Sequence, residues 1–537
     1  MKRWIAIGFI AIALGGMAFA GGSQQQAEAP SRVTVAIDEP VVETFLFWTG
    51  RNWEYLDMML EPLVGNDPVT GELTNDRIAE SWEHNSNFTT WTFRIRPGIQ
   101  FHNDWGEVTS ADVVHSFALQ TGDDSVIPGV EQVRDGRVTA VDQYTVRFEF
   151  PSPRRDFAFN VAGRATFFIY SKRQYDQGGV NAYETQPSGT GHFQYVRHSP
   201  GTVLYRRVDN HYSGFRPDFE ELELRLVSEP STRLAMLRTG EAHIAELPRE
   251  LHRDAIGAGF GIVSSSLPSM QTDVVFNGLY LSSEEEPEIR ARAQSLPWAD
   301  VRIREAINRA INREEMLDVL FEGRAGLVVR YAMHGPHEGY DPTLKERFEQ
   351  WYGYNPDRAR QLMAEAGYPH RFADPVIPLI RTSLHGQPEL DVQTDLIYEY
   401  LTAVGFQARI VEMDSASMLA LGRNRGLFYL NPIRNAPIRP TESAIIAFYT
   451  RPGGPAQGYE TDKGIGLVQQ IVNTIDAGRR EVLIKELFNY LFETYNDIPL
   501  FEVHTEMVVN NDVVAGWVYP GVTSYGYGHW HMIKKAQ

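Results

Sequence analysis

The sequence predicts an α/β protein with more than one domain. Runs with a period of two residues, typical of half-buried strands, are followed by capped helical patterns along most of the chain. Residues 90–96 alternate apolar and polar side chains, and Thr109 with Asp112 then resembles a capping box that opens a helix. At 537 residues the chain exceeds the size at which one hydrophobic core keeps growing.

Composition excludes several functional classes. The chain has no cysteine, which rules out disulfides, thiol nucleophiles, cysteine metal sites and a lipid-modified cysteine. The formal net charge of −19 disfavours binding to nucleic acid or to anionic lipid. We therefore expect an acidic protein without a nucleic-acid partner.

The first thirty residues have the pattern of an exported protein. Lys2 and Arg3 precede an apolar run over 4–14, and the small residues around Ala18 and Ala20 form a cleavage site. This predicts a signal peptide over 1–20, cleaved near Ala20, and a flexible lead-in over 21–30. An uncleaved membrane anchor is the alternative, but the apolar run is short for a membrane span.

The first half of the mature chain reads as strands joined by helices. Residues 32–37 alternate as the first strand, and 55–63 carry a helical apolar stripe. Two strands joined by a Pro-Gly turn are expected over 192–212. Ser231 is predicted to cap a helix that Gly240 ends.

The second half has stronger helical signals. The acidic stretch 282–295 reads as a solvated loop, and 300–323 as two helices, the first starting at Asp300 and the second capped by Asn312. Asn, Pro and Gly at the ends of 355–367 define another helix. Residues 376–412 form a predicted βαβ unit, and a last long helix over 481–495 leads into a strand.

Three stretches in a fixed order carry a family resemblance. A helix-turn ending in AESWE (79–83), the strand TWTFRIRPGIQFHN (90–103) and the helix start TSADVVHSF (109–117) together resemble the signature of extracellular solute-binding proteins of family 5, the peptide and nickel type that serves ABC importers. The residues 301–325 and 355–367 are similar to two further helical segments of that family. The residues of the signature itself are expected to pack in the protein core and not to contact a ligand.

The resemblance implies a fold and a domain order. It implies a periplasmic-binding-protein-like (class II) two-lobed fold with an extra inserted domain and mixed sheets flanked by helices. The expected domain I combines 31–60, 186–272 and 497–537, domain II covers 61–185, and domain III, the second lobe, covers 273–496. The strands at 273–277 and 496–502 are the expected hinge.

The resemblance also places ligand contacts in the second lobe. Arg381 ends a strand of the βαβ unit, and dipeptide-binding relatives keep an arginine there for the peptide carboxylate; a surface arginine is the alternative. In 428–440, Ala436 replaces the aspartate of peptide-binding relatives and Asn431 the histidine of nickel-binding ones. Arg434 and Arg439 then supply positive charge that favours an anionic or polyhydroxylated solute, whose polar groups Asn431 and Asn435 could hydrogen-bond.

In the first lobe, the family's cleft loop corresponds to 45–53. Phe47 and Trp48 are the candidate ligand contacts of that loop, with plain core packing as the alternative. Together with Arg381, Arg434, Asn431 and Asn435 they complete the predicted binding site.

The resemblance implies a periplasmic receptor that binds a peptide-like or other small polar solute and delivers it to the membrane subunits of an ABC permease. The chain is expected to act as a monomer and not as an enzyme. Alternatives are a receptor of the same fold for an oligosaccharide or an opine-like solute, a chemosensory or chaperone-like binding protein, and a secreted hydrolase.

The residues give little support to enzyme or metal chemistry. The chain has neither a G-x-S-x-G elbow nor an H-E-x-x-H motif. His529 and His531 could supply two imidazoles to a metal, but no third ligand lies near them in the sequence. We therefore expect no cofactor and no metal.

Overall fold

The structure, a computed structural model, describes residues 30–39, 43–50, 56–127, 130, 133–159, 167–266, 268, 270–330, 333, 338–382, 389–435, 445, 459–519 and 529–537. The predicted signal peptide and most of the lead-in lie outside the described residues, as does Ala436.

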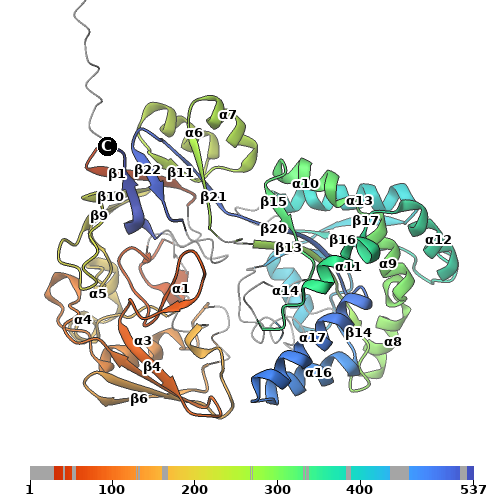
Figure 1. The fold of residues 1–537 in the computed structure, drawn as a ribbon, viewed down its shortest axis with the longest axis horizontal. Helices are drawn as coiled ribbons and strands as arrows, with labels where there is room; N and C mark the ends of the chain where they lie inside the picture. The colour runs from red at the N-terminus through yellow and green to blue at the C-terminus, as the bar shows by residue number, and fades with distance from the viewer. Residues whose placement is uncertain are drawn as a thin grey trace, which may run out of the picture.

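The chain forms two lobes, as Figure 1 shows. The first lobe contains a seven-stranded and a four-stranded sheet, and the second contains a six-stranded sheet. The C-terminus lies in the first lobe, beside the strand that begins the described chain. This two-lobed α/β architecture is the predicted fold.

The seven-stranded sheet joins segments from both ends of the chain. Its strands, in spatial order, are β12 (Gly261–Ser264), β21 (Glu506–Val509), β11 (Ile244–Ala245), β1 (Arg32–Ile37), β10 (Glu221–Leu226), β9 (Thr202–Arg207) and β8 (Phe193–Ser199). β1 runs parallel to both of its neighbours. Thr34 and Ala36 are therefore buried along with the valines, which is typical of a strand covered on both faces.

The four-stranded sheet contains the first two stretches that resemble the family signature. Its order is β4 (Ala79–His84), β5 (Thr90–Ile95), β7 (Thr145–Glu149) and β6 (Arg137–Asp142). Trp91, Phe93 and Ile95 are buried, as predicted. The predicted helix-turn ending in AESWE is wrong: the residues form β4, because they pair antiparallel with β5.

Helices and short strand pairs complete the first lobe: α1 (Phe47–Gly50), α3 (Ser110–Gln120), α4 (Lys172–Gly178), α5 (Val180–Thr185), α6 (Pro230–Thr239), α7 (His252–Gly257), β2 (Gly65–Asn66) with β3 (Leu73–Thr74), and β22 (Val514–Trp517) with β23 (Ile533–Lys535). The capping box of Thr109 and Asp112 is confirmed at α3. The predicted cap at Ser231 is wrong, because Pro230 takes the first helical position and Glu229 precedes it.

The six-stranded sheet forms the centre of the second lobe. Its order is β15 (Ala325–Leu327), β20 (Asp497–Val503), β13 (Met270–Phe276), β18 (Leu430–Asn435), β16 (Ile377–Arg381) and β17 (Ala408–Glu412). β16 and β17 are parallel and joined through α13 (Glu389–Val404), which confirms the predicted βαβ unit.

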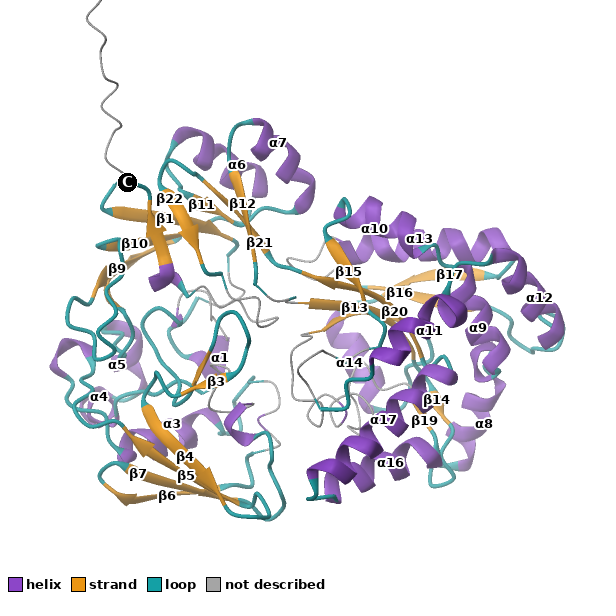
Figure 2. Ribbon diagram, in the orientation of Figure 1, coloured by secondary structure: helices purple, strands orange, loops and turns teal. Residues whose placement is uncertain are grey.

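Helices surround this sheet, as Figure 2 shows. Besides α13 they are α8 (Pro287–Ser295), α9 (Val301–Ala310), α10 (Arg313–Phe321), α11 (Pro342–Tyr352), α12 (Pro356–Ala366), α14 (Ser415–Arg423), α16 (Asp462–Asn473) and α17 (Ala477–Glu493), with β14 (Leu279–Tyr280) paired to β19 (Tyr459–Glu460). The caps Asp300, Asn312 and Asn355 are confirmed. The predicted loop over 282–295 is wrong in its second part, where Pro287 starts α8.

The chain passes between the lobes at two places. It leaves the first sheet after β12 and joins the second at β13, and it returns between the end of β20 and the start of β21. The strands predicted as hinges lie inside the second-lobe sheet. The changes of sheet fall instead between 264 and 270 and at 504–505. β20 therefore belongs to the second lobe, whereas the expected boundary at 497 assigns it to domain I.

Candidate functional site

The candidate site lies at the boundary between the lobes, where β18 ends beside the crossing strands. Asn435 pairs with Gln271 of β13, and Gln271 pairs on its other side with Glu502, near the end of β20. The end of β18 that carries Arg434 and Asn435 thus lies close to the point where β20 leaves for the first lobe. The side chains of these two residues lie outside the described part. Asn431, earlier on the same strand, is buried opposite Val275.

Arg381 lies at the end of β16, as predicted, but it has acidic partners within its own lobe. Its guanidinium forms ion pairs with Asp395 of α13 and with Glu412 of β17, the latter at 3.0 Å. A ligand carboxylate would have to compete with these two side chains. Arg381 therefore remains a predicted contact that its observed surroundings do not favour.

Phe47 and Trp48 pack inside the first lobe. The ring of Phe47 is fully buried with its centroid 4.9 Å from that of Phe168. The ring of Trp48 lies edge-on to Tyr170, at 5.2 Å, and close to Tyr183. This aromatic packing accounts for both residues without a ligand.

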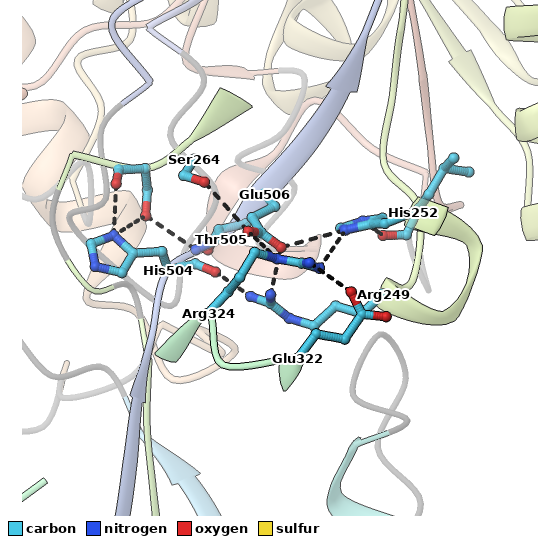
Figure 3. A network of polar contacts seen from close by, with 10 residues as sticks. Arg249, His252, Ser264, Glu322, Arg324, His504, Thr505 and Glu506 are labelled. Carbon is cyan, nitrogen blue, oxygen red and sulfur yellow. Dashed lines mark hydrogen bonds and ion pairs between the residues drawn. The ribbon is translucent and has the colours of Figure 1, made fainter. Parts of the chain in front are cut away.

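A network of charged residues joins the two lobes at the crossing (Figure 3). Glu506, at the start of β21, accepts hydrogen bonds from Arg249 of the first lobe and from Arg324 of the second. The Arg324 contact joins Nε to Oε1 at 3.2 Å, and the Nδ1 of His252 lies 3.4 Å from Oε2. The side chain of Glu506 is only 3% exposed. One buried carboxylate therefore holds cations from both lobes.

The two crossing segments also bind each other. The backbone N–H of Thr505 donates to the Ser265 hydroxyl, and that of Ser265 donates to the Thr505 carbonyl at 2.8 Å. His504 contributes its backbone carbonyl, which accepts from Arg249 at 2.7 Å. The crossing between the lobes is therefore a hydrogen-bonded ribbon of two chain segments.

The electrostatics of the hinge favour an ionised Glu506. Burial alone raises the pKa of its carboxyl, but the hydrogen bond to His252 and the charges of Arg249 and Arg324 outweigh this effect and hold the pKa below its usual value. Glu506 is thus ionised at neutral pH.

A second contact joins the lobes through α16, which lies at the end of the second lobe away from the crossing strands (Figure 1). Arg155 of the first lobe donates to the carbonyls of Val472 and Thr474, at 2.7 and 2.9 Å. Thr474 is the C-cap of α16, so the guanidinium meets the negative end of the helix.

Sequence reasoning missed these interlobe residues. Glu506 directly precedes the apolar run Met507–Val509. A charged residue next to a buried strand is the sequence signal that could have identified it. The partners Arg249, Arg324 and Arg155 carry no local signal, because only the tertiary fold brings them to the lobe boundary.

Comparison with known proteins decides the family. The model of the bacterial extracellular solute-binding proteins, family 5, matches residues 75–449. The chain belongs to this family. It is a solute receptor of two-lobed fold.

Three relatives of this solute-binding protein differ in what they bind. The glutathione-binding protein GsiB of Pectobacterium atrosepticum is 23% identical over 463 residues, which cover 81% of this chain and 80% of the relative. The periplasmic binding protein DppA from Helicobacter pylori, solved with the peptide STSA, has a TM-score of 0.71 at 18% identity and covers 95% of this chain and 99% of its own. The protein MoaA from A.tumefacien R10, solved with mannopinic acid, has a TM-score of 0.70 at 19% identity and covers 95% of this chain and 100% of its own.

Among the described residues of this solute-binding protein, no helix combines the length and apolar character needed to cross a membrane.

Proposed function

We propose that this solute-binding protein is the receptor of an ABC importer and binds a peptide-like or other small polar solute, anionic solutes included, between its lobes. The observation that carries the proposal is the two-strand crossing, beside which β18 ends with Arg434 and Asn435. A ligand held there meets both lobes, so its binding energy favours their closed arrangement.

Arg434 is the proposed centre of ligand recognition. A guanidinium offers a planar pair of donors to a carboxylate, and the amides of Asn431 and Asn435 suit hydroxyl or amide groups. Arg381 is the second choice, because Asp395 and Glu412 already neutralise it. Phe47 and Trp48 are the proposed first-lobe contacts, although their rings also pack against Phe168 and Tyr170.

The test begins with a thermal-shift screen of peptides, glutathione, opine-like acids, oligosaccharides and nickel chelates. For the compound that stabilises most, calorimetry on Arg434→Ala should show at least about tenfold weaker binding, since about 1.4 kcal/mol is enough for that change. Arg360→Ala, which removes an exposed arginine of α12, is the matched control and should bind normally. Unchanged affinity in Arg434→Ala together with loss in Arg381→Ala would place the ligand at β16 instead.

An opine-like or oligosaccharide solute is the alternative ligand class. The MoaA structure with mannopinic acid supports it, because a protein of the same fold holds an opine. Competition between a dipeptide and mannopinic acid in the same calorimetric cell distinguishes the two classes.

The proposal also covers the export of the protein, its oligomeric state and the absence of ligand turnover. The protein is proposed to be exported with cleavage near Ala20, monomeric, and without turnover of its ligand. N-terminal sequencing of periplasmic protein, light scattering on the purified chain, and mass spectrometry of the ligand after long incubation test these statements. Recovery of a hydrolysed ligand would favour the secreted hydrolase.

The division into domains is proposed with one change from the sequence-based expectation. The seven-stranded sheet defines domain I, the four-stranded sheet domain II, and the six-stranded sheet, with β20 included, domain III. Limited proteolysis with mass spectrometry should place the first interdomain cuts near 265–269 and 504–505.

A further inference from the structure

A buried group of histidines surrounds one carboxylate in the first lobe, in segments that flank β8 and β9. Glu61, His192 and His211 each offer a metal-binding atom, and these atoms lie within 4.8 Å of one another. All three side chains are buried. Among the described residues this is the group of histidine and acidic side chains with spacing suited to a metal ion.

Further imidazoles extend the group. The ring of His192 lies between those of His211 and His531, with centroids 3.8 and 4.0 Å away. The ring of His529 follows at 5.5 Å from His531. The two C-terminal histidines therefore lie beside the group, in ring contact with His192 and with each other.

Hydrogen bonds already hold the carboxylate in place. Oε2 of Glu61 accepts from the hydroxyls of Thr190 and Tyr212, at 2.8 and 2.9 Å, and Oε1 accepts from Arg77 at 2.8 Å. A carboxylate oxygen has a second lone pair, so Oε1 can still bind an ion. The positive charge of Arg77 opposes a cation, but Asp76 lies close enough to offset part of it.

His211 has hydrogen-bond partners for either tautomer. With the proton on Nε2 it donates to the Thr190 carbonyl at 2.9 Å, and Nδ1 accepts from the Ser213 backbone. With the proton on Nδ1 it donates to the Ser213 hydroxyl at 2.7 Å, which leaves the Nε2 lone pair for an ion. A partner of this kind orients metal-bound histidines in general.

We propose that Glu61, His192 and His211 bind one divalent transition-metal ion. Imidazole and carboxylate groups suit Zn²⁺. Ni²⁺ and Cu²⁺ are expected to compete with Zn²⁺ for the site, because both stand high in the general order of affinities for divalent metal ions. Bonds of about 2.1 Å put tetrahedral ligand atoms roughly 3.4 Å apart, so side-chain shifts on the order of 1 Å complete the site. The ion is a resident structural ion, separate from any ligand between the lobes.

The test uses untagged, full-length protein after dialysis against a chelator. Calorimetry with Zn²⁺ should show one equivalent per chain, and Co²⁺ should give the intense visible absorption of a tetrahedral site. His192→Ala and His211→Ala should weaken Zn²⁺ binding at least about a hundredfold. His198→Ala, which removes a partly exposed histidine of β8, is the matched control and should bind like the parent.

Two results would overturn the proposal: no stoichiometric binding by the parent protein, or equal affinity in the parent and in both folded variants. If the alanine variants fail to fold, X-ray absorption on the Zn²⁺-loaded parent decides the matter. A shell of imidazole nitrogens with a carboxylate oxygen supports the site, and a shell of water oxygens alone contradicts it.

Discussion

At the scale of single residues, Glu506 has the most direct influence on the lobe boundary. It is a buried carboxylate with guanidinium groups from both lobes as partners. Removing one member of such a group leaves the others charged and poorly solvated, which costs more than the intact group contributes.

Glu506→Gln is expected to lower the free energy of unfolding by about 2 kcal/mol. Breaking a fully buried ion pair costs about 3–5 kcal/mol, and the partial exposure of Arg324 reduces this figure. Urea denaturation followed by tryptophan fluorescence measures the change. Glu322→Gln, which removes the exposed partner of Arg324, is the control with an expected change below about 1 kcal/mol. Equal effects in the two variants would contradict the assignment.

The same carboxylate predicts a pH dependence. Because the folded chain holds the pKa of Glu506 below the ordinary value of 4.5, the unfolded chain binds the proton more readily. The stabilisation is therefore complete above about pH 4.5 and is lost as the pH falls through the lower folded pKa. The difference in unfolding free energy between the parent and Glu506→Gln should shrink from about pH 6 to about pH 3. A difference that stays constant would rule out this contribution.

At the scale of elements, the sequence predicted the first residues of helices correctly where a single capping side chain determines them. Asn355 caps α12 and Gly367 ends it in a left-handed conformation, as expected. The failures have different causes. AESWE forms a strand because it pairs with the strand that follows it, a tertiary contact that overrides the local pattern. Residues 287–295 form a helix because Pro287 occupies its first turn, a local signal that the acidic composition of the stretch concealed.

The ligand segment shows the same limit. The sequence placed Arg381 at the end of a parallel strand correctly. The sequence did not indicate that the carboxylates of Asp395, in α13, and Glu412, in β17, would form ion pairs with the Arg381 guanidinium. Which charge pairs with which depends on the register of β16 and β17 and on the placement of α13.

Asp112→Ala is expected to destabilise the first lobe by about 2–3 kcal/mol. One carboxylate oxygen accepts from the backbone and the hydroxyl of Thr109, and the other accepts from the backbone N–H of Lys172 at the start of α4. The change removes a cap and leaves a buried donor without its acceptor. Thermal or urea unfolding measures it. Asp357→Ala, in the exposed first turn of α12, should change stability by less than about 0.5 kcal/mol.

At the scale of the whole molecule, the lobes contact each other at the hinge and at the C-terminal end of α16. The Arg155 contact lies on α16, away from the crossing strands, and can break without disturbing the hinge. It is therefore the contact most directly linked to lobe opening.

Arg155→Ala is expected to shift the lobes toward a more open arrangement. The chain has no cysteine, so Val141→Cys in β6 and Val482→Cys in α17 introduce labelling sites at exposed positions of the two lobes. Spin-label distance measurements should give a longer and broader distribution in the variant. Arg154→Ala, whose guanidinium pairs with Asp135 of the first lobe, is the control. An unchanged distribution in Arg155→Ala would show that the contact does not hold the lobes.

The position of β21 has a consequence for the order in which the chain matures. β21 lies between β11 and β12 and pairs antiparallel with both, although nearly the whole second lobe is synthesised between β12 and β21. Until residues 506–509 have left the ribosome, two strand edges of the first sheet stay unpaired and the lobe is incomplete. Because β21 is an inner strand that is synthesised late, the first sheet cannot be completed until synthesis of the chain is nearly finished.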